Sequence, residues 1–245
     1  MISKQQLSFV RSLHQKKYRQ MYGKFLVEGD KLVTELLASS YKIEAIFKTS
    51  TWDLPIQRDK INVIEVSEEE LRKISTHETP NQVLAVVYIP VQQSDITAKP
   101  LQDGLYLACD NLNDPGNAGT LIRTADWFGV KHIFFSNGSV DIYNPKVVSA
   151  AKGSLFRVGC HYVDLGEIIK HNRNLAVYGA YMDGKSIYNN ALQKNALLII
   201  GNEANGIGDE LASLITHQIS IPNFGKAESL NAAVAAGIIL GEFRR

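Results

Sequence analysis

From residue 104 onward, short apolar runs alternate with segments of helical periodicity. The apolar runs are 105–110, 132–137, 175–182, 196–203 and 218–222. Several of them are apolar at nearly every position, so both faces of the strand must be covered in the folded protein. Strands of this kind, separated by helices, are typical of a parallel sheet with helices on both faces. The second part of the chain is therefore predicted to be an α/β domain.

The first part of the chain predicts a smaller α/β unit. Helices are expected at 3–20 and 30–39, and strands at 24–29, 43–49, 62–67 and 83–89. A further helix is expected to start after Ser67, which is followed by three glutamates in the manner of a capped first turn. The segment 93–103 is polar and aperiodic, as linkers are. The predicted organisation is a domain at 1–92, a linker at 93–103 and a domain at 104–245.

Charge is unevenly distributed along the chain. The whole chain has 26 Lys and Arg against 25 Asp and Glu, yet residues 1–31 contain seven basic side chains and two acidic ones. Such a face could contact phosphates, or it could be an ordinary solvated helix face. The two cysteines, Cys109 and Cys160, lie in apolar runs and have neither a disulfide framework nor a metal-ligand spacing. We interpret them as buried, inert thiols.

Several familiar classes of protein are excluded by missing patterns. The first twenty residues lack the apolar core of a signal peptide, and no apolar run approaches the roughly 18 residues of a membrane helix. A cytoplasmic protein without a membrane partner is expected. The stretch 201–206 has the two glycines of a phosphate-binding P-loop, but Ile207 and Gly208 replace its Lys and Ser/Thr. The histidines show no metal-ligand spacing, so no metal is expected. There is no G-x-S-x-G motif, so a serine hydrolase is not expected either.

Three polar, glycine-bearing loops follow strands in the second domain. They begin the stretches 110–130, 201–211 and 222–243. Because parallel strands end at the same edge of a sheet, these loops should converge there, where open α/β sheets bind their ligands.

Two positions on the helices that follow these loops deserve particular notice. Arg123 comes six residues after Asn117, so the two lie within about 60–120° of each other around a helix axis and could hold a phosphate or hydroxyl. The alternative is that Asn117 caps the helix while Arg123 pairs with Asp114 or Asp126. For the last helix, 230–243, Ser229 is the expected N-cap. Asn231 would then lie in its first turn, which capping explains less well.

Three motifs in order resemble the SpoU-type (TrmH-like) RNA 2′-O-ribose methyltransferases of the SPOUT class. They are 114-DPGNAGTLIRTADWFGV-130, 201-GNEANGIGDEL-211 and 221-IPNFGKAESLNAAVAAGIILGE-242, and 143-YNPKVVSAAKGSLFRV-158 also fits. The resemblance covers nearly all of residues 105–243. One motif alone is weak, but three in order with matching spacings are specific. The first domain is similar to the small substrate-binding domain of members that include mitochondrial ribosomal-RNA methyltransferases.

The resemblance implies a fold, a cofactor and a set of functional residues. The fold would be a SPOUT-type parallel sheet ending in a C-terminal trefoil knot, which binds S-adenosylmethionine in a bent shape and forms the interface of a homodimer. The implied catalytic residues are Arg123, Asn117, Glu203, Ser229 and Asn231. The implied cofactor-binding residues are Ala180, Gly201, Asn202, Gly206, Ile221, Ser229 and Leu230. With RNA as the implied partner, Lys16, Lys17, Arg19 and Arg123 become the expected RNA-binding residues.

The expected reaction transfers a methyl group from S-adenosylmethionine to a ribose 2′-hydroxyl, in ribosomal RNA in preference to transfer RNA. An arginine keeps its proton at neutral pH, so Arg123 is expected to act as a charged stabiliser of the developing alkoxide and not as a general base. The alternatives are methylation of a base, methylation of transfer RNA, and a non-catalytic RNA-binding or ribosome-assembly factor that kept the fold.

Overall fold

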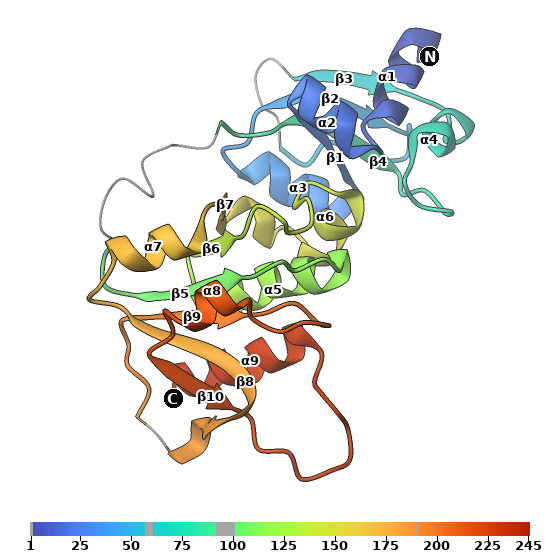
Figure 1. The fold of residues 1–245 in the computed structure, drawn as a ribbon. Helices are drawn as coiled ribbons and strands as arrows, with labels where there is room; N and C mark the ends of the chain where they lie inside the picture. Colours follow the sequence, from blue (N-terminus) through green and yellow to red (C-terminus); the bar gives the residue numbers. More distant parts are fainter. Residues whose placement is uncertain (1, 57–60, 92–100, 190) are drawn as a thin grey trace. The chain divides into compact units, whose positions relative to one another are not determined.

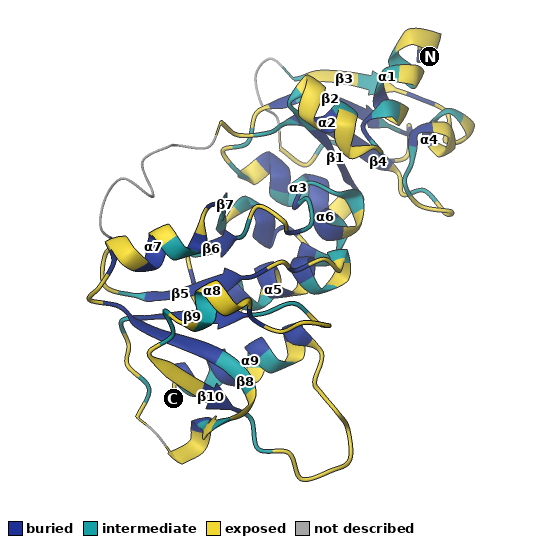
Figure 2. Cartoon of the chain, in the orientation of Figure 1, coloured by how far each residue is buried: buried dark blue, intermediate teal, exposed yellow. Residues whose placement is uncertain are grey.

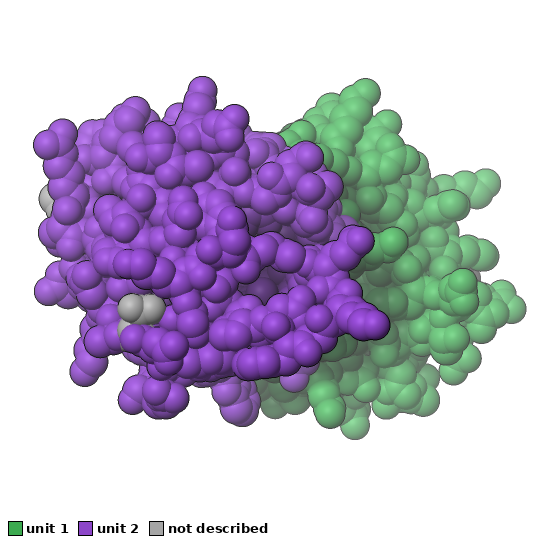
Figure 3. Space-filling model, turned by 60° about the horizontal axis from the view of Figure 1, so that its bottom comes forward, with its two compact units in different colours: residues 1–91, 141–156 green, residues 92–140, 157–245 purple. Residues whose placement is uncertain are grey.

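A computed structural model describes residues 2–56, 61–91, 101–189 and 191–245. The chain divides into two compact units, residues 1–91 with 141–156 and residues 92–140 with 157–245 (Figure 3). Most of the predicted linker, residues 93–100, lies outside the described residues. The segment 141–156 groups with the first unit although it lies within the predicted second domain, 104–245.

The first unit is built on a four-stranded mixed sheet with the strand order β1-β4-β2-β3. The strands are β1 (Lys24–Glu28), β2 (Ile43–Lys48), β3 (Asn62–Glu65) and β4 (Val83–Tyr88). β4 pairs antiparallel with β1 and β2, while β2 pairs parallel with β3. β1 and β4 are buried over most of their length, as Figure 2 shows. The four strands predicted for this part of the sequence are confirmed.

Helices cover this sheet. They are α1 (Lys4–Ser12), α2 (Lys16–Tyr22), α3 (Asp30–Ala38), α4 (Glu68–Ile74) and α6 (Pro145–Ala151), with a 3-10 turn η2 (Ser154–Phe156). The predicted start of α4 is confirmed: Ser67 accepts from the backbone N–H of Glu70, whose side chain accepts from the backbone N–H of Ser67. The single helix predicted at 3–20 is wrong, because the chain breaks into α1 and α2 after Ser12.

Arg19 binds the chain at this break. Its side chain is only 2% exposed, and one guanidinium nitrogen donates to the carbonyls of Leu13 and His14 at 2.9 and 2.8 Å. These are carbonyls that a helix end leaves without partners. The other two nitrogens donate to Asp141 Oδ2 at 2.9 and 2.6 Å. The prediction that Arg19 contacts RNA is therefore wrong, since its donors are occupied inside the first unit.

The second unit contains a six-stranded sheet with the order β10-β8-β9-β5-β6-β7 (Figure 1). Its strands are β5 (Leu105–Cys109), β6 (His132–Phe135), β7 (Gly159–Tyr162), β8 (Ala176–Ser186), β9 (Ala196–Ile200) and β10 (His217–Ser220). Every pairing is parallel. β5 and β9 are buried at every residue. This confirms the α/β architecture with a parallel sheet; β7 is a strand that the sequence analysis did not identify.

Helices lie on both faces of this sheet. They are α5 (Pro115–Trp127), α7 (Leu165–His171), α8 (Asp209–Ala212) and α9 (Ala232–Phe243), with a 3-10 turn η3 (Ile187–Asn189). Val177 of β8 packs in the core that Ile168 of α7 also joins. The next strand residue, Tyr178, meets Phe243 of α9 edge-on at 5.1 Å. Because successive strand residues point to opposite faces, α7 and α9 cover opposite sides of the sheet.

The strand order places a switch point beside β5. From β5 the chain proceeds to β6 and β7 on one side, and it then crosses to β8, β9 and β10 on the other. The loops that follow β5 and β9 therefore border the crevice where open α/β sheets bind ligands. No helix among the described residues has the length and apolar character to span a bilayer.

Candidate functional site

Three side chains from three loops meet at the switch point. Asn117, in the first turn of α5, donates through Nδ2 to Glu203 Oε1 at 2.7 Å. Asn231, at the start of α9, donates through Nδ2 to Asn117 Oδ1 at 2.7 Å. Both ends of the Asn117 amide are thus used, and this orients it unambiguously. We call Asn117, Glu203 and Asn231 the amide–carboxylate trio.

The start of α5 leaves the Asn117 side chain available for this role. Asp114 is the N-cap, and its Oδ1 accepts from the backbone N–H of Asn117 at 2.7 Å. Pro115 follows at the first helical position, where its lack of an N–H costs nothing. The alternative in which Asn117 caps the helix is therefore wrong, because the preceding aspartate does so.

Glu203 lies in a tight turn that fixes its backbone. Asn202 and Gly206 exchange backbone hydrogen bonds of 2.8 and 2.9 Å, and the Asn202 side chain accepts from the N–H groups of residues 204 and 205. Gly201 must be glycine, because a Cβ there would lie 2.3 Å from the carbonyl carbon of Gly206. Gly206 itself has a φ of 67°, which favours glycine. Asn202 and both glycines are thus structural parts of the loop that presents Glu203.

Asn231 has a second role that corrects the sequence analysis. The N-cap of α9 is Asn231 and not Ser229: Asn231 Oδ1 accepts from the backbone N–H groups of Ala233 and Val234 at 2.9 and 3.3 Å. The helix consequently begins at Ala232. The side chain of Asn231 therefore caps α9 with its oxygen and binds Asn117 with its nitrogen. Ser229 is exposed and lies ahead of the cap.

Arg123 lies on α5 with an exposed side chain. Among the described residues, no hydrogen bond or ion pair engages its guanidinium. The predicted alternative, a pair with Asp114 or Asp126, is not what the structure contains. Asp114 caps the helix, and Asp126 pairs with Arg157 at 2.8 Å. Arg123 is also not hydrogen-bonded to the trio, so its cation remains available to a ligand.

Two residues that the sequence analysis overlooked connect the loops. Asp110, only 4% exposed, accepts from the backbone N–H of Gly208 through Oδ2 at 2.9 Å. The carbonyl of Asn111, whose φ is 49°, accepts from Asn202 Nδ2 at 2.7 Å. These contacts hold the loop after β5 against the loop after β9. The available signal was an aspartate placed directly at the carboxyl end of a fully apolar strand.

The residues expected to bind the cofactor lie in the middle of β8 and in the loops that follow β9 and β10. Ala180 is in β8, just beyond the part of that strand that pairs with β9. The register of β10 also skips this region: Gln218 pairs with Gly179, and Ile219 pairs with Lys185. The backbone of residues 180–184 is therefore outside both ladders. This segment can offer backbone N–H and carbonyl groups to an adenosyl group.

The remaining expected cofactor residues suit the same ligand. Gly201 immediately follows β9 and Ile221 immediately follows β10, and both are half-buried. Leu230, just before the cap of α9, is 49% exposed, which leaves an apolar side chain without full cover. Backbone polar groups combined with partly open apolar side chains are typical of a site for a nucleoside. The chain thus has a suitable donor set for S-adenosylmethionine at this edge.

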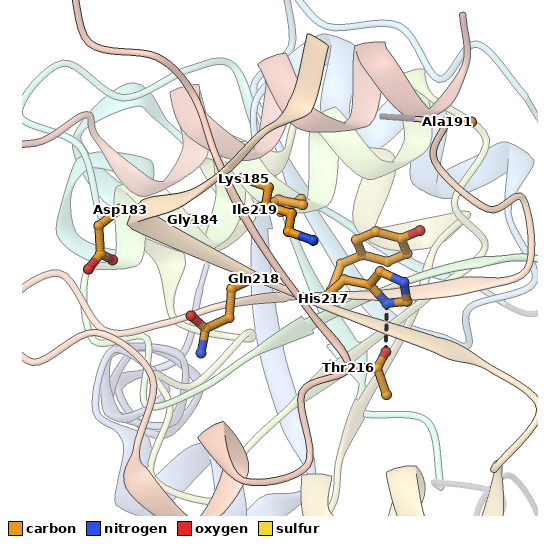
Figure 4. A pocket seen from close by; sticks show the side chains of 9 residues that line it. Asp183, Gly184, Lys185, Ala191, Thr216, His217, Gln218 and Ile219 are labelled. Carbon is orange, nitrogen blue, oxygen red and sulfur yellow. Dashed lines mark hydrogen bonds between the residues drawn. The ribbon is translucent and has the colours of Figure 1, made fainter. Parts of the chain in front are cut away.

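A cavity of about 470 Å³ lies between β8 and β10 (Figure 4). It is lined by Tyr178, Asp183, Gly184, Lys185, Ala191, Thr216, His217, Gln218 and Ile219. His217 stacks on Tyr178 with ring centroids 4.6 Å apart, and His217 Nδ1 is 2.8 Å from Thr216 Oγ1. The cavity borders residues 180–184 of β8, which lie outside both ladders. No residue of the amide–carboxylate trio lines it. The described residues also hold no cluster of three or more His, Cys, Asp or Glu that could bind a metal.

The two remaining RNA-binding candidates are accessible. Lys16 and Lys17 are both exposed on α2, in contrast to the buried Arg19. The cysteines are not part of the trio. Burial raises the pKa of the Cys109 thiol, and the nearby Cys160, Glu203 and Asp110 raise it further. Cys160 is half-buried and not buried as predicted, yet desolvation raises the pKa of its thiol to about 12, so both cysteines fit the interpretation as inert thiols.

Comparison with known protein families matches both parts of the chain. Residues 104–241 match the family described as "SpoU rRNA Methylase family", and residues 4–85 match the "MRM3-like substrate binding domain". A relative in Bacillus subtilis (strain 168), 23S rRNA (guanosine(2553)-2′-O)-methyltransferase RlmP, is 31% identical over 96% of this chain and 94% of its own length.

Solved structures give the same assignment. A putative RNA methyltransferase of the TrmH family from Porphyromonas gingivalis has a TM-score of 0.88 and 37% identity, covering 99% of this chain and 98% of the other. The SpoU methyltransferase AviRb from Streptomyces viridochromogenes, in complex with the cofactor AdoMet, has a TM-score of 0.86 and 25% identity, covering 99% and 97%. This chain belongs to the SpoU rRNA methylase family.

Proposed function

We propose that this chain is an S-adenosylmethionine-dependent methyltransferase that acts on the ribose 2′-hydroxyl of ribosomal RNA. The observation that carries the proposal is the amide–carboxylate trio, which joins three loops at the switch point of a SpoU-family sheet. Ribosomal RNA is favoured over transfer RNA because the Bacillus subtilis relative, which aligns with nearly the whole chain, is named for 2′-O-methylation of 23S ribosomal RNA.

When bound, S-adenosylmethionine would supply an electrophilic methyl group, with its positively charged sulfur as the leaving group that keeps the electrons of the carbon–sulfur bond, and the proton of the ribose hydroxyl would pass to solvent water. The chain must then align the ribose oxygen and manage the loss of its proton. We assign Arg123 to the phosphate next to the reacting ribose, where its fixed positive charge lowers the free energy of the developing alkoxide. Its exposed guanidinium, free of partners among the described residues, supports this role.

The trio has a positioning role in this proposal. Asn117 has one N–H and one oxygen lone pair in use, which leaves its second N–H and a lone pair for the ribose. Glu203 fixes the amide from one side, and Asn231 fixes it from the other. Ser229 and Leu230 would then shape the cofactor side of the site, together with backbone groups near Ala180, Gly201, Asn202, Gly206 and Ile221.

The test is methyl transfer from radiolabelled S-adenosylmethionine to ribosomal RNA, followed by mass spectrometry of the modified nucleoside. Arg123→Ala should lower the rate at saturating substrates by about 10²- to 10³-fold, as removal of a transition-state donor does elsewhere. Its affinity for S-adenosylmethionine, measured by calorimetry, should be unchanged. Arg173→Ala, which removes another exposed arginine of the second unit, is the matched control. An Arg123→Ala variant with a near wild-type rate contradicts the assignment, and a methylated base contradicts the reaction.

We further propose that the C-terminal segment threads into a trefoil knot. β10 lies at the edge of the sheet beyond β8 and β9, yet Asn231 returns to Asn117 just after β5. The segment 221–231 must therefore pass the carboxyl ends of β8 and β9, next to the loop that follows β9. This path supports a threaded connection that encloses the cofactor site.

The knot region is also the proposed interface of a homodimer. α5 and α9 pack on each other, and both carry exposed apolar side chains. Trp127 of α5 is 83% exposed, and Val234 and Ile238 of α9 are 51% and 36% exposed. Val234 and Ile238 are four residues apart and share one helix face. Sedimentation velocity should find a dimer for the wild type and a monomer for Ile238→Glu; a monomeric wild type contradicts the proposal.

The proposed division of labour follows the two family matches. Residues 1–92 would bind the RNA substrate, with Lys16 and Lys17 contacting phosphates, and residues 104–245 would bind the cofactor and catalyse transfer. We place this activity in the cytoplasm, in line with the bacterial relative that methylates ribosomal RNA.

A further inference from the structure

An unbroken series of aromatic rings and lysine ammonium groups lies on the first unit. Its first half comes from α1 and α2. Lys17 Nζ is 5.8 Å from the ring centroid of Tyr18, and Tyr18 stacks on Tyr22 with centroids 6.3 Å apart. Tyr22 then meets Phe9 edge-on, with centroids 5.2 Å apart.

The second half of the series runs onto the sheet. Lys24 Nζ lies 5.2 Å from the Phe9 ring and 5.0 Å from the Tyr88 ring. Lys24 and Tyr88 are register partners on β1 and β4, so the sheet itself holds them together. Lys42 Nζ lies 4.8 Å from the same Tyr88 ring. Lys24 also forms an ion pair with Glu44. This ion pair holds the ammonium group that connects the Phe9 ring to the Tyr88 ring. We call these seven residues the aromatic–lysine series: Lys17, Tyr18, Tyr22, Phe9, Lys24, Tyr88 and Lys42.

The series is accessible along its length. Lys17 and Lys42 are exposed, Phe9, Tyr18, Lys24 and Tyr88 are half-buried, and Tyr22 is 41% exposed. Beside it, Met21 is 69% exposed. An exposed cation–π contact stabilises a fold by only about 0.5–1 kcal/mol, so these contacts do not by themselves account for so many accessible rings. Interleaved rings and cations on a surface do match one ligand chemistry well, because unstacked bases bind aromatic faces while phosphates bind lysines.

We propose that the aromatic–lysine series is the surface on which unpaired nucleotides of the RNA substrate stack. This inference rests on the proposed function and deepens it, because it specifies a single-stranded stretch of RNA for the first unit. A-form duplex RNA keeps its base faces inside the helix and presents only phosphates, 2′-hydroxyls and base edges. The rings would therefore add nothing to duplex binding, whereas the lysines would contribute to both. Among the basic residues of the first 31, the proposal assigns Lys17 and Lys24 to the RNA surface and leaves out Arg19, which is buried.

The test uses the full chain and three fluorescein-labelled probes in fluorescence anisotropy. They are a 12-nucleotide oligouridylate, an abasic ribose-phosphate oligomer of the same length, and a 12-base-pair RNA duplex. The wild type should bind the oligouridylate more tightly than either of the others. Tyr22→Ala should weaken oligouridylate binding by roughly 5- to 150-fold, the loss of one base stack, with little effect on the abasic probe. Tyr22→Phe, which keeps the ring, should bind as the wild type does.

Lysine and control variants separate charge from stacking. Lys42→Gln should weaken binding of the oligouridylate and the abasic probe alike, and it should reduce the salt dependence by about 0.7 in the logarithmic slope. Tyr188→Ala removes a ring of the second unit that is 46% exposed, and Lys131→Gln removes an exposed lysine at the amino end of β6. Both controls should leave oligouridylate affinity unchanged. If Tyr22→Ala lowers the melting temperature, Tyr22→Leu keeps the apolar volume and should still lose the preference for bases.

The outcomes distinguish the surface from the proposed function. Equal wild-type affinity for the three probes, or oligouridylate affinity that survives both Tyr22→Ala and Tyr22→Leu, overturns the surface while methyl transfer by the wild type stands. A wild type that neither binds S-adenosylmethionine in calorimetry nor transfers methyl groups overturns the proposed function. The surface is still supported in that case if the wild type prefers the oligouridylate to the abasic probe and Tyr22→Ala loses this preference.

Discussion

Replacing Arg19 with methionine tests the buried ion pair of the first unit. The methionine stem fills much of the apolar space of the arginine, but it cannot donate. Asp141, whose side chain is 12% exposed, would lose its cation, and the carbonyls of Leu13 and His14 would lose their donor. The change therefore removes one partner of a buried pair and leaves the other in place. This is the case in which a buried ion pair has a large effect.

The expected cost follows from these contacts. Removing one partner of a buried pair destabilises a protein by about 3–5 kcal/mol. Each carbonyl left without a donor can add about 1–3 kcal/mol, but His14 is only half-buried and water can serve it. We therefore expect a loss of at least about 3 kcal/mol in the free energy of unfolding. For a unit of this size, that lowers the melting temperature by roughly 12–20 °C.

The assay is urea unfolding followed by circular dichroism for the wild type, Arg19→Met, Asp141→Asn and the double variant. The double variant should be more stable than Arg19→Met, because the amide removes the uncompensated charge yet still accepts from the N–H of Tyr143. Arg11→Met is the control, since Arg11 is exposed on α1 and should change stability by less than about 0.5 kcal/mol. If Arg19→Met costs under about 1 kcal/mol and instead weakens RNA binding, the argument for a structural Arg19 is refuted.

Three further outcomes are expected. Asn231→Ser keeps an N-cap, so the free energy of unfolding should change by only a few tenths of a kcal/mol. Serine cannot reach Asn117, so the rate of methyl transfer should fall by about 10²-fold. A normal rate would contradict the role of the trio. Burial, together with the charge of the neighbouring His132, lowers the pKa of His161 to about 4. The imidazole therefore binds a proton more readily in the unfolded chain than in the folded one, and stability should fall as the pH drops from about 6.5 to 4. In urea titrations His161→Gln should flatten this slope, and an unchanged slope would exclude His161 as its source. Cys109 should react with a thiol reagent at pH 8 only after unfolding; rapid reaction of the native chain would show that the thiol is accessible.

Local patterns were sufficient for much of the fold. The start of α4 depends on Ser67 and Glu70, which are three residues apart and bond to each other directly. The buried strands β5 and β9 are apolar at every residue, a signal that needs no knowledge of the partner strands. These features depend only on residues that are close together in the sequence, so the sequence alone can predict them.

Local patterns failed where two short-range solutions competed. Ser229 and Asn231 are both good N-caps, and the predicted cap was the serine. The structure selects Asn231, whose nitrogen is also held by Asn117, 114 residues earlier in the chain. Likewise, the pattern at 3–20 is continuous, and the break after Ser12 coincides with a guanidinium that binds the carbonyls at the end of α1. In both cases the residue that binds the helix end also makes a long-range contact, Asn231 with Asn117 and Arg19 with Asp141.

The sequence by itself determined most of the strands of this protein, the three polar loops after them and the residue types of a SpoU-family site, but not β7 or the break between α1 and α2. The tertiary structure decided which of those residues meet. Asn117 and Glu203 are 86 residues apart, and Arg19 and Asp141 are 122 apart. Such pairs are set by the order of strands in the sheet and by the return path of the chain, and neither is encoded in any window of neighbouring residues. For that reason Arg19 looked like a surface cation in the sequence and is a buried structural one in the fold.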